Sequence, residues 1–148
     1  MKKDYKPILC LDFDGVIHSY TSGWKGPRVI PDNPVPGAME FISLQALYGD
    51  FQIAIYSSRS RYWFGRRAMQ KWLELHMSFY FHAKAGFVSP TPDFVPEKTN
   101  KVIRAISWPL FKPSALVTID DRAIRFDGTW PTDAELKEKP WYLKENKP

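Results

Sequence analysis

Three short apolar segments, each leading into polar residues, constrain the fold of this chain more than any other feature. They span residues 8–13, 51–56 and 116–119. Apolar runs of this length without alternation are typical of strands that are buried on both faces, as in parallel sheets. Helices are expected between them, over residues 37–48 and over 62–76, where apolar side chains recur along one stripe. The sequence therefore predicts an α/β fold with a Rossmann-like, mostly parallel sheet and helices on both faces.

The segments between and after these elements are less regular. Residues 15–36 are rich in Gly, Pro, Ser, Trp and Tyr, which predicts an irregular or hairpin-like flap, and residues 83–98 are Pro-rich and irregular. Residues 102–108 are apolar, but the run is too short and unperiodic to distinguish a strand from a helix. We expect a short strand at 123–126 and a short helix near 132–138.

Functional groups gather where the predicted strands end. They are Asp12 and Asp14 after the first strand, Ser57 and Arg59 after the second, and Asp120 and Asp121 after the third. Open parallel sheets bind ligands outside the carboxyl ends of their strands, so we expect these groups to converge on one site. Carboxylates this close would repel one another unless a cation lay among them. Oxygen ligands suit Mg²⁺, whereas the three histidines show no zinc-ligand spacing.

Length, charge and cysteine content limit the class of protein. The 148 residues correspond to a single domain over 1–148, and the net charge of +5 favours anionic substrates. The single cysteine, Cys10, lies in an apolar run, which excludes a disulfide within the chain and indicates a small buried side chain. The sequence shows neither a signal peptide nor a membrane span, so we expect a cytoplasmic protein that does not bind membranes.

The strand-end residues resemble known motifs. Asp12-Phe13-Asp14-Gly15-Val16, Ser57 and Ile119-Asp120-Asp121-Arg122-Ala123 resemble motifs one, two and four of the haloacid dehalogenase-like hydrolase superfamily. Further stretches resemble a small subgroup of that superfamily from phages and bacteria: His18-Ser19-Tyr20, Ser22-Gly23-Trp24, Pro34-Val35-Pro36-Gly37-Ala38, Ser57-Ser58-Arg59-Ser60 and Lys112-Pro113. The resemblance implies the superfamily's fold, and the short segments between motifs leave no room for more than a minimal cap.

The resemblance also implies roles for these residues. Asp12 would be the nucleophile that becomes transiently phosphorylated, and Asp14 the general acid and base. Ser57 would hydrogen-bond a phosphoryl oxygen. Mg²⁺ would be held by Asp12, by the backbone carbonyl of Asp14 and by at least one of Asp120 and Asp121. The second aspartate, Asp14, argues against carbon–halogen cleavage, because dehalogenating members of the superfamily lack it.

The superfamily's third motif, a lysine, has several candidates in this chain. Lys98 and Lys101 have the usual spacing before Asp120, and Lys84 lies further upstream, whereas Lys112-Pro113 matches the subgroup. We assign the role to Lys112 and leave the other three as alternatives.

We expect Ser58, Arg59 and Lys98 to bind substrate. Arg59 and Arg122 flank the predicted site, and a guanidinium suits a second phosphate or a structural carboxylate equally well.

These expectations favour a Mg²⁺-dependent phosphomonoester hydrolase. Its substrate would be a phosphorylated molecule such as a nucleotide or the 3'-phosphate end of a nucleic acid, since bases stack on aromatic rings and phosphates bind Arg and Lys. Five flap residues either contact that substrate or simply pack the flap: His18, Tyr20, Trp24, Lys25 and Arg28. The alternative function is a non-catalytic module on the same fold that binds nucleic acid or protein. No obligate protein partner is evident.

Overall fold

Three parallel strands form the sheet of the protein. The computed structural model describes residues 4–86 and 95–137 of the chain. The strands are β1 (Ile8–Leu11), β2 (Gln52–Ile55) and β3 (Val117–Ile119), in the order β2-β1-β3. Leu11 at the end of β1 is level with both Ile55 and Ile119. All three expected strands are confirmed, and because they are parallel their carboxyl ends meet at one edge of the sheet.

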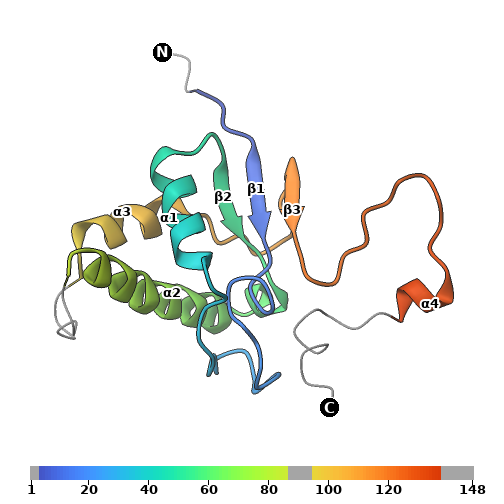
Figure 1. Ribbon diagram of the computed structural model, residues 1–148, viewed down its shortest axis with the longest axis horizontal. Coiled ribbons are helices and arrows are strands. Elements are labelled where there is room, and N and C mark those ends of the chain that lie inside the picture. The colour runs from blue at the N-terminus through green and yellow to red at the C-terminus, as the bar shows by residue number, and fades with distance from the viewer. Residues whose placement is uncertain (1–3, 87–94, 138–148) are drawn as a thin grey trace.

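The three longest helices lie together on one side of that sheet. The helices are α1 (Ala38–Tyr48), the short 3₁₀ helix η1 (Ser58–Arg61), α2 (Trp63–Lys84), α3 (Glu97–Ala105) and α4 (Asp133–Leu136), and α4 lies apart from the others, beyond β3 in Figure 1. The helices α1, α2 and α3 contact one another, and Figure 1 shows them on the β2 side, away from β3. Within the described residues, the expected second layer of helices is not found, so that part of the prediction is wrong.

The direction of the crossovers explains the single layer. Beyond β2 the sheet gains one more extended residue, Ser107, whose N–H donates to the Ile53 carbonyl at 3.0 Å and whose carbonyl accepts from Ile55 N–H at 3.0 Å. The chain thus steps from β1 to β2 to Ser107 in one direction, and right-handed crossovers in one direction place their helices on one face. The return from Ser107 to β3 contains no helix.

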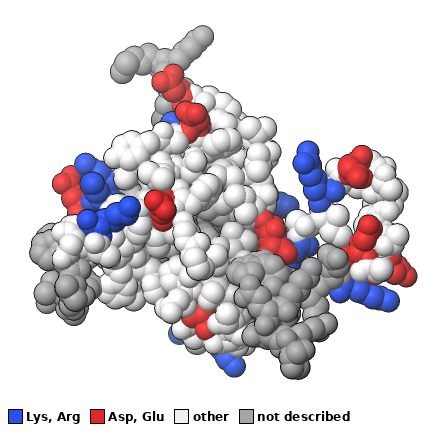
Figure 2. Space-filling view, in the orientation of Figure 1, with Lys and Arg blue, Asp and Glu red and all other residues white. Residues whose placement is uncertain are grey.

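The hydrophobic core lies between the helices and the β1–β2 half of the sheet. Leu9, Leu11, Ile53 and Ile55 face it, and the helices contribute buried side chains that include Ile42, Met69, Leu73, Met77 and Val102. The core stops short of β3, whose residues are all exposed. In Figure 2 the centre of this face of the body carries few charged side chains.

Element boundaries differ from expectation in three places. Helix α2 continues past residue 76 to Lys84, because Met77, Ser78 and His82 keep its buried stripe going. The ambiguous stretch 102–108 divides into the end of α3 and the extended Ser107. No strand forms at 123–126, whereas α4 confirms the short helix after residue 132. Residues 87–94 of the segment expected to be irregular lie outside the described residues.

The flap is hairpin-like, as expected. His18 bridges to Pro34 in an antiparallel pair, Ser19 N–H donates to the Asn33 carbonyl at 3.0 Å, and Val35 N–H donates to the Ile17 carbonyl at 2.8 Å. These bonds tie the two ends of the flap together directly beside the end of β1. Among the described residues, no helix is both long and apolar enough to cross a membrane.

Candidate active site

A cavity of about 290 Å³ opens at the carboxyl edge of the sheet. Each strand contributes residues to its lining: Cys10, Asp12 and Asp14 from β1 and the turn after it, Tyr56, Ser57 and Ser58 from the end of β2, and Thr118, Asp120 and Arg122 from β3 and beyond. The flap adds Tyr20, and the return segment before β3 adds Lys112. The structure therefore brings most of the predicted site residues to one place.

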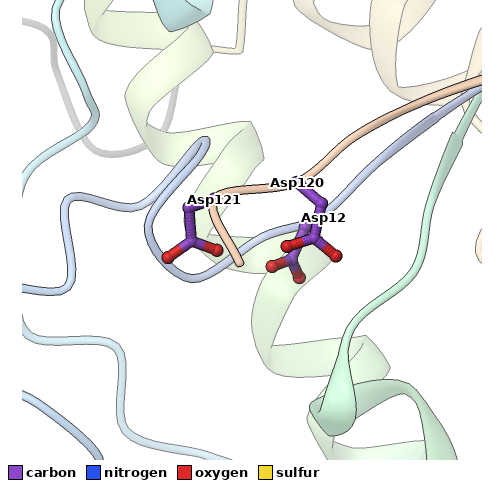
Figure 3. A group of neighbouring side chains, drawn as sticks. All are labelled: Asp12, Asp120 and Asp121. Atoms are coloured by element: carbon purple, nitrogen blue, oxygen red, sulfur yellow. The ribbon is translucent and has the colours of Figure 1, made fainter. Parts of the chain in front are cut away.

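Three carboxylates form a cluster at this edge. Asp12, Asp120 and Asp121 each offer an oxygen, and these oxygens lie within 4.8 Å of one another. Figure 3 shows the three side chains leaving the ends of β1 and β3 and pointing to the same side of the chain. Local bonds fix two of them: Asp12 accepts from Phe13 N–H at 2.8 Å, and Asp120 accepts from Arg122 N–H at 2.8 Å.

The cluster is electrostatically strained. Burial raises the pKa of Asp12 to about 7, and the negative charges of Asp120 and Asp121 add to the rise, while the Phe13 N–H bond opposes it. Burial likewise raises the pKa of Asp121. Carboxylates resist ionisation in such a place because each charge loses water and meets like charges. A cation among the three carboxylates would offset both the loss of water and the repulsion between like charges.

Asp121 shows where a cation would fit. Both of its carboxylate oxygens are buried, and neither accepts a hydrogen bond of standard geometry from the described residues, although the carboxyl group of Asp12 and the backbone N–H of Asp121 itself lie close by. The Nε of Arg122 forms an ion pair with Oδ2 at 3.8 Å, a distance too long for a hydrogen bond. Buried carboxylates normally have donors or bind metals. An all-oxygen set that includes a buried carboxylate without a standard hydrogen bond fits Mg²⁺.

Asp14 pairs with Arg59 and is not part of the cluster. The Nε of Arg59 donates to Oδ2 at 2.9 Å and its Nη2 donates to Oδ1 at 3.1 Å, a bidentate contact. Burial alone would raise the pKa of Asp14, but hydrogen bonds from His18 and Arg59 outweigh it and hold the pKa below its ordinary value. The carboxylate of Asp14 is therefore not a member of the metal cluster, although it does line the cavity.

Arg59 is fully buried and fastens the flap. Its Nη1 donates to the carbonyls of Gly26, Pro27 and Val29 at 2.9, 3.1 and 3.1 Å. The Trp24 ring covers the guanidinium at 4.7 Å. Arg59 does not line the cavity, so of its two expected roles the geometry favours the structural carboxylate over substrate binding.

His18 extends this network. Its Nδ1 lies 2.8 Å from Oδ1 of Asp14, and its Nε2 accepts the backbone N–H of Asp32 at 3.1 Å. Because a backbone N–H can only donate, Nε2 carries no proton and Nδ1–H donates to Asp14. The carboxylate of Asp32 in turn accepts from the N–H and hydroxyl of Ser22 at 2.9 and 2.5 Å. Nothing in the sequence singled out Asp32, whose partners are distant in the chain.

Tyr20 is held in the left-handed region of backbone conformation, with φ of 60°. This region is rare for residues other than Gly, Asn and Asp, and it persists only when the surrounding structure imposes it. The bonds from Ser22 to Asp32, and from Gly23 N–H to the Tyr20 carbonyl at 3.1 Å, impose it here. The result places Tyr20 on the cavity wall.

The other flap residues named above do not line the cavity. His18 is buried, Trp24 covers Arg59, and the guanidinium of Arg28 lies 4.5 Å from the centre of the Phe64 ring. Lys25 is exposed.

Ser57 caps η1 at the cavity wall. Its Oγ accepts from Arg59 N–H at 3.2 Å, which leaves the hydroxyl hydrogen to donate to a ligand oxygen. Gly65 in the first turn of α2 allows this arrangement, since a Cβ there would lie 2.2 Å from the Arg59 carbonyl oxygen. The structure thus holds η1 and its cap firmly against α2.

Of the four candidate lysines, Lys112 is the one that lines the cavity. It lies near Cys10, where burial raises the pKa of the thiol and the positive charge of Lys112 opposes that rise. Lys101 pairs with Glu97 at 3.3 Å. Lys84 lies over the Tyr80 ring, and Lys98 lies with it beside a second hollow between α2 and α3. The expected substrate contact by Lys98 is therefore not at this cavity.

Comparisons of the chain with protein-family models, with curated proteins and with solved structures find no match.

Proposed function

We propose that the protein is a Mg²⁺-dependent phosphomonoester hydrolase of the haloacid dehalogenase-like type, with Asp12 as its nucleophile. One observation carries the proposal: the carboxylates of Asp12, Asp120 and the buried Asp121 cluster at a cavity that Asp12, Ser57, Lys112 and Asp120 line. Carboxylate, cation site, hydroxyl and amine around one small cavity are the groups that phosphoryl transfer through an aspartate uses.

The first step transfers the phosphoryl group to the enzyme. A carboxylate oxygen of Asp12 attacks phosphorus, the bond from phosphorus to the ester oxygen breaks, and that oxygen takes a proton from Asp14. Arg59 and His18 favour ionised Asp14, so the proton must be gained when substrate binds. A phosphate dianion beside Asp14 raises its proton affinity by like-charge repulsion, which works in this direction.

The second step releases phosphate. Water attacks phosphorus and gives a proton to Asp14, and the bond from phosphorus to Asp12 breaks. Here the ionised form that Arg59 stabilises is the one required. Ser57 and Lys112 hold phosphoryl oxygens during both steps.

Asp12, Asp120 and Asp121 would hold Mg²⁺, which when bound offsets the repulsion between the carboxylate and the phosphate. Without a cation the pKa of Asp12 lies near 7, so a large fraction of the nucleophile is protonated at neutral pH. The chain's own residues therefore form an incomplete site.

The leaving group is expected to be a nucleoside or a nucleic-acid end. The net charge of +5 favours anions, and two aromatic residues, Tyr20 and Tyr56, line the cavity. Such a substrate also agrees with a cytoplasmic location.

The test is a hydrolysis screen of the full chain with Mg²⁺ on nucleotides, sugar phosphates and 3'- or 5'-phosphorylated oligonucleotides. Asp12→Asn is the inactive reference, and Asp50→Asn, an exposed carboxylate outside the site, is the matched control. We expect released phosphate with the control and none with Asp12→Asn. Phosphate release that survives Asp12→Asn or excess chelator contradicts the proposal. Binding of oligonucleotides without any hydrolysis would favour the non-catalytic module.

A further inference from the structure

The β3 edge of the sheet is apolar and uncovered. Parallel strands are almost always covered on both faces, yet Val117 is 46% and Ile119 is 39% exposed. One long side of β3 has no neighbouring strand among the described residues. Among the described residues, no segment covers this face and edge of β3.

A groove runs from β3 to α1. It has a volume of about 250 Å³, and apolar side chains dominate its lining, including Leu11, Val16, Ile17, Val35, Phe41 and Ile119. Leu44 and Tyr48 continue the apolar surface along the exposed side of α1. The scarcity of charge in the centre of Figure 2 agrees with this composition. An exposed apolar surface of this kind marks an interaction site.

The chain after β3 carries a second uncovered apolar set. Residues 122–137, which we call the arm, extend away from the body in Figure 1 and end in α4. Their apolar side chains are strongly exposed: Ile124 at 52%, Phe126 at 59% and Trp130 at 83%. The arm nevertheless has local order, since Thr132 and Glu135 form a capping box for α4.

We infer that two copies of this chain exchange their arms, each arm covering the β3 edge and the α1 groove of the other copy. The arm leads away from the sheet it follows, so it does not cover its own β3 in this conformation. One two-fold exchange covers both apolar surfaces of both copies, and swapped segments are a common route to dimers.

The sequence of the arm fits an exposed strand edge. Ile124 and Phe126 are two residues apart, so in an extended chain they face the same side. This pattern led us to expect a strand at 123–126, and in the described chain that segment has no strand to pair with. Addition of an extended segment to an open sheet edge is a frequent mode of recognition.

The exposed apolar surfaces of two copies are large enough to form a stable dimer interface. Phe and Trp side chains bury about 150–250 Å² each, so the two aromatic residues of each arm contribute roughly 600–1,000 Å² in a pair of copies. The grooves and β3 edges that they cover lose a comparable area. Together these reach the roughly 1,200–2,000 Å² of a stable interface. This inference does not rest on the proposed function.

The first measurement is the mass of the full chain in solution, by light scattering during gel filtration. We expect a dimer, and a monomer for the double variant Phe126→Ser, Trp130→Ser. The matched control is Trp63→Ser, which removes a Trp that is 69% exposed on α2 and should leave the dimer intact. Circular dichroism checks that each variant is folded. A monomeric wild-type chain, or a double variant that stays dimeric, overturns the inference.

The second measurement separates exchange from a dimer through another surface. Chains with Phe126→Cys and chains with Val117→Cys are co-expressed and treated with a bis-maleimide, while the native Cys10 is buried and stays in place. Arm exchange predicts a covalent heterodimer. Replacing Phe126→Cys by Trp63→Cys should abolish it. A chain carrying both cysteines that links only within itself shows that the arm folds back on its own β3, which also overturns the inference.

Discussion

Arg59 and Asp14 form a bidentate ion pair inside the protein, with the Arg59 side chain fully buried and Nε and Nη2 at 2.9 and 3.1 Å from the two carboxylate oxygens. The same guanidinium binds three carbonyls of the flap. The pair therefore connects the turn after β1 to the loop that covers it. Movement of the flap near Gly26 would change the contacts of Arg59, the residue that holds Asp14.

Arg59→Met should destabilise the protein severely. Methionine keeps most of the side-chain length but removes the bidentate partner of the buried Asp14 carboxylate and leaves it only the hydrogen bond with His18. Breaking a buried ion pair by removing one partner costs about 3–5 kcal/mol in comparable cases. Urea unfolding followed by Trp fluorescence measures the loss. Arg61→Met, which removes an exposed guanidinium two residues away, is the control and should change the free energy of unfolding by less than about 0.5 kcal/mol. Equal effects of the two substitutions would show that the buried pair is not important for stability.

The metal-free protein should become less stable as the pH rises from about 4 to 7. In the folded state Asp12 has a pKa of about 7 against an ordinary value of 3.8, so over this window the unfolded chain loses a proton that the folded chain keeps. The free energy of unfolding then falls by up to about 1.4 kcal/mol per pH unit.

Asp14 and Asp32 have lowered pKa values, and their contribution is lost only below about pH 4. Thermal melts in chelator across this range measure the slope. Asp12→Asn should flatten it, while Asp50→Asn should not. A slope that is the same in Asp12→Asn and wild type contradicts the assignment.

Mg²⁺ should stabilise the protein through the carboxylate cluster. A ligand that binds only the folded state adds about 2.7 kcal/mol at a hundredfold excess over its dissociation constant. Asp121→Asn removes the buried carboxylate and should weaken this effect, as a titration of melting temperature against Mg²⁺ will show. Asp127→Asn on the arm is the control. The idea fails if Mg²⁺ raises the melting temperature of Asp121→Asn as much as that of the wild type.

Asp12→Asn and Asp14→Asn should fail at different steps. Asp12→Asn removes the nucleophilic charge, so neither phospho-enzyme nor turnover should be detected, a loss beyond about 10³-fold. Asp14→Asn keeps the nucleophile and removes the proton relay, which is typically worth about 10² to 10⁴-fold.

With p-nitrophenyl phosphate, whose leaving group needs little protonation, acid-quenched Asp14→Asn should therefore carry trapped phosphate. Intact-protein mass spectrometry reads it directly. Phosphate on Asp12→Asn, or full activity of Asp14→Asn on an alkyl phosphate, would contradict the assigned roles.

Tyr20→Gly should relieve backbone strain in the folded protein and, at the same time, weaken the binding of substrate. Glycine accepts the φ of 60° without strain, so the substitution relieves about 1 kcal/mol or more of backbone strain. It also removes an aromatic ring from the cavity wall, so the KM for nucleotide substrates should rise. The two readouts are the melting temperature and the KM. Tyr20→Phe is the control that keeps the ring. An unchanged KM in Tyr20→Gly would show that the strained ring does not contact substrate.

The sequence could predict the strands because short apolar runs that end in Asp or Ser can form few structures other than buried strands. It could also predict that Asp12, Ser57 and Asp120 meet, since parallel strands share an edge. It could not show that Arg59 also fastens the flap, because those partners are backbone carbonyls, which carry no side-chain signal. The number of helical layers was predicted wrongly for a related reason: it depends on crossover direction, which periodicity does not encode.

The pairing of β1 with β3 has a consequence for how the protein is made. Leu11 and Ile119 are neighbours in the sheet but lie on the order of a hundred residues apart in the chain. While the ribosome is still translating the helices after β2, β1 can pair with β2, but Asp120 and Asp121 have not yet been made. The mutual repulsion of the three carboxylates arises only after β3 has been synthesised, when the helical side of the sheet can already be packed.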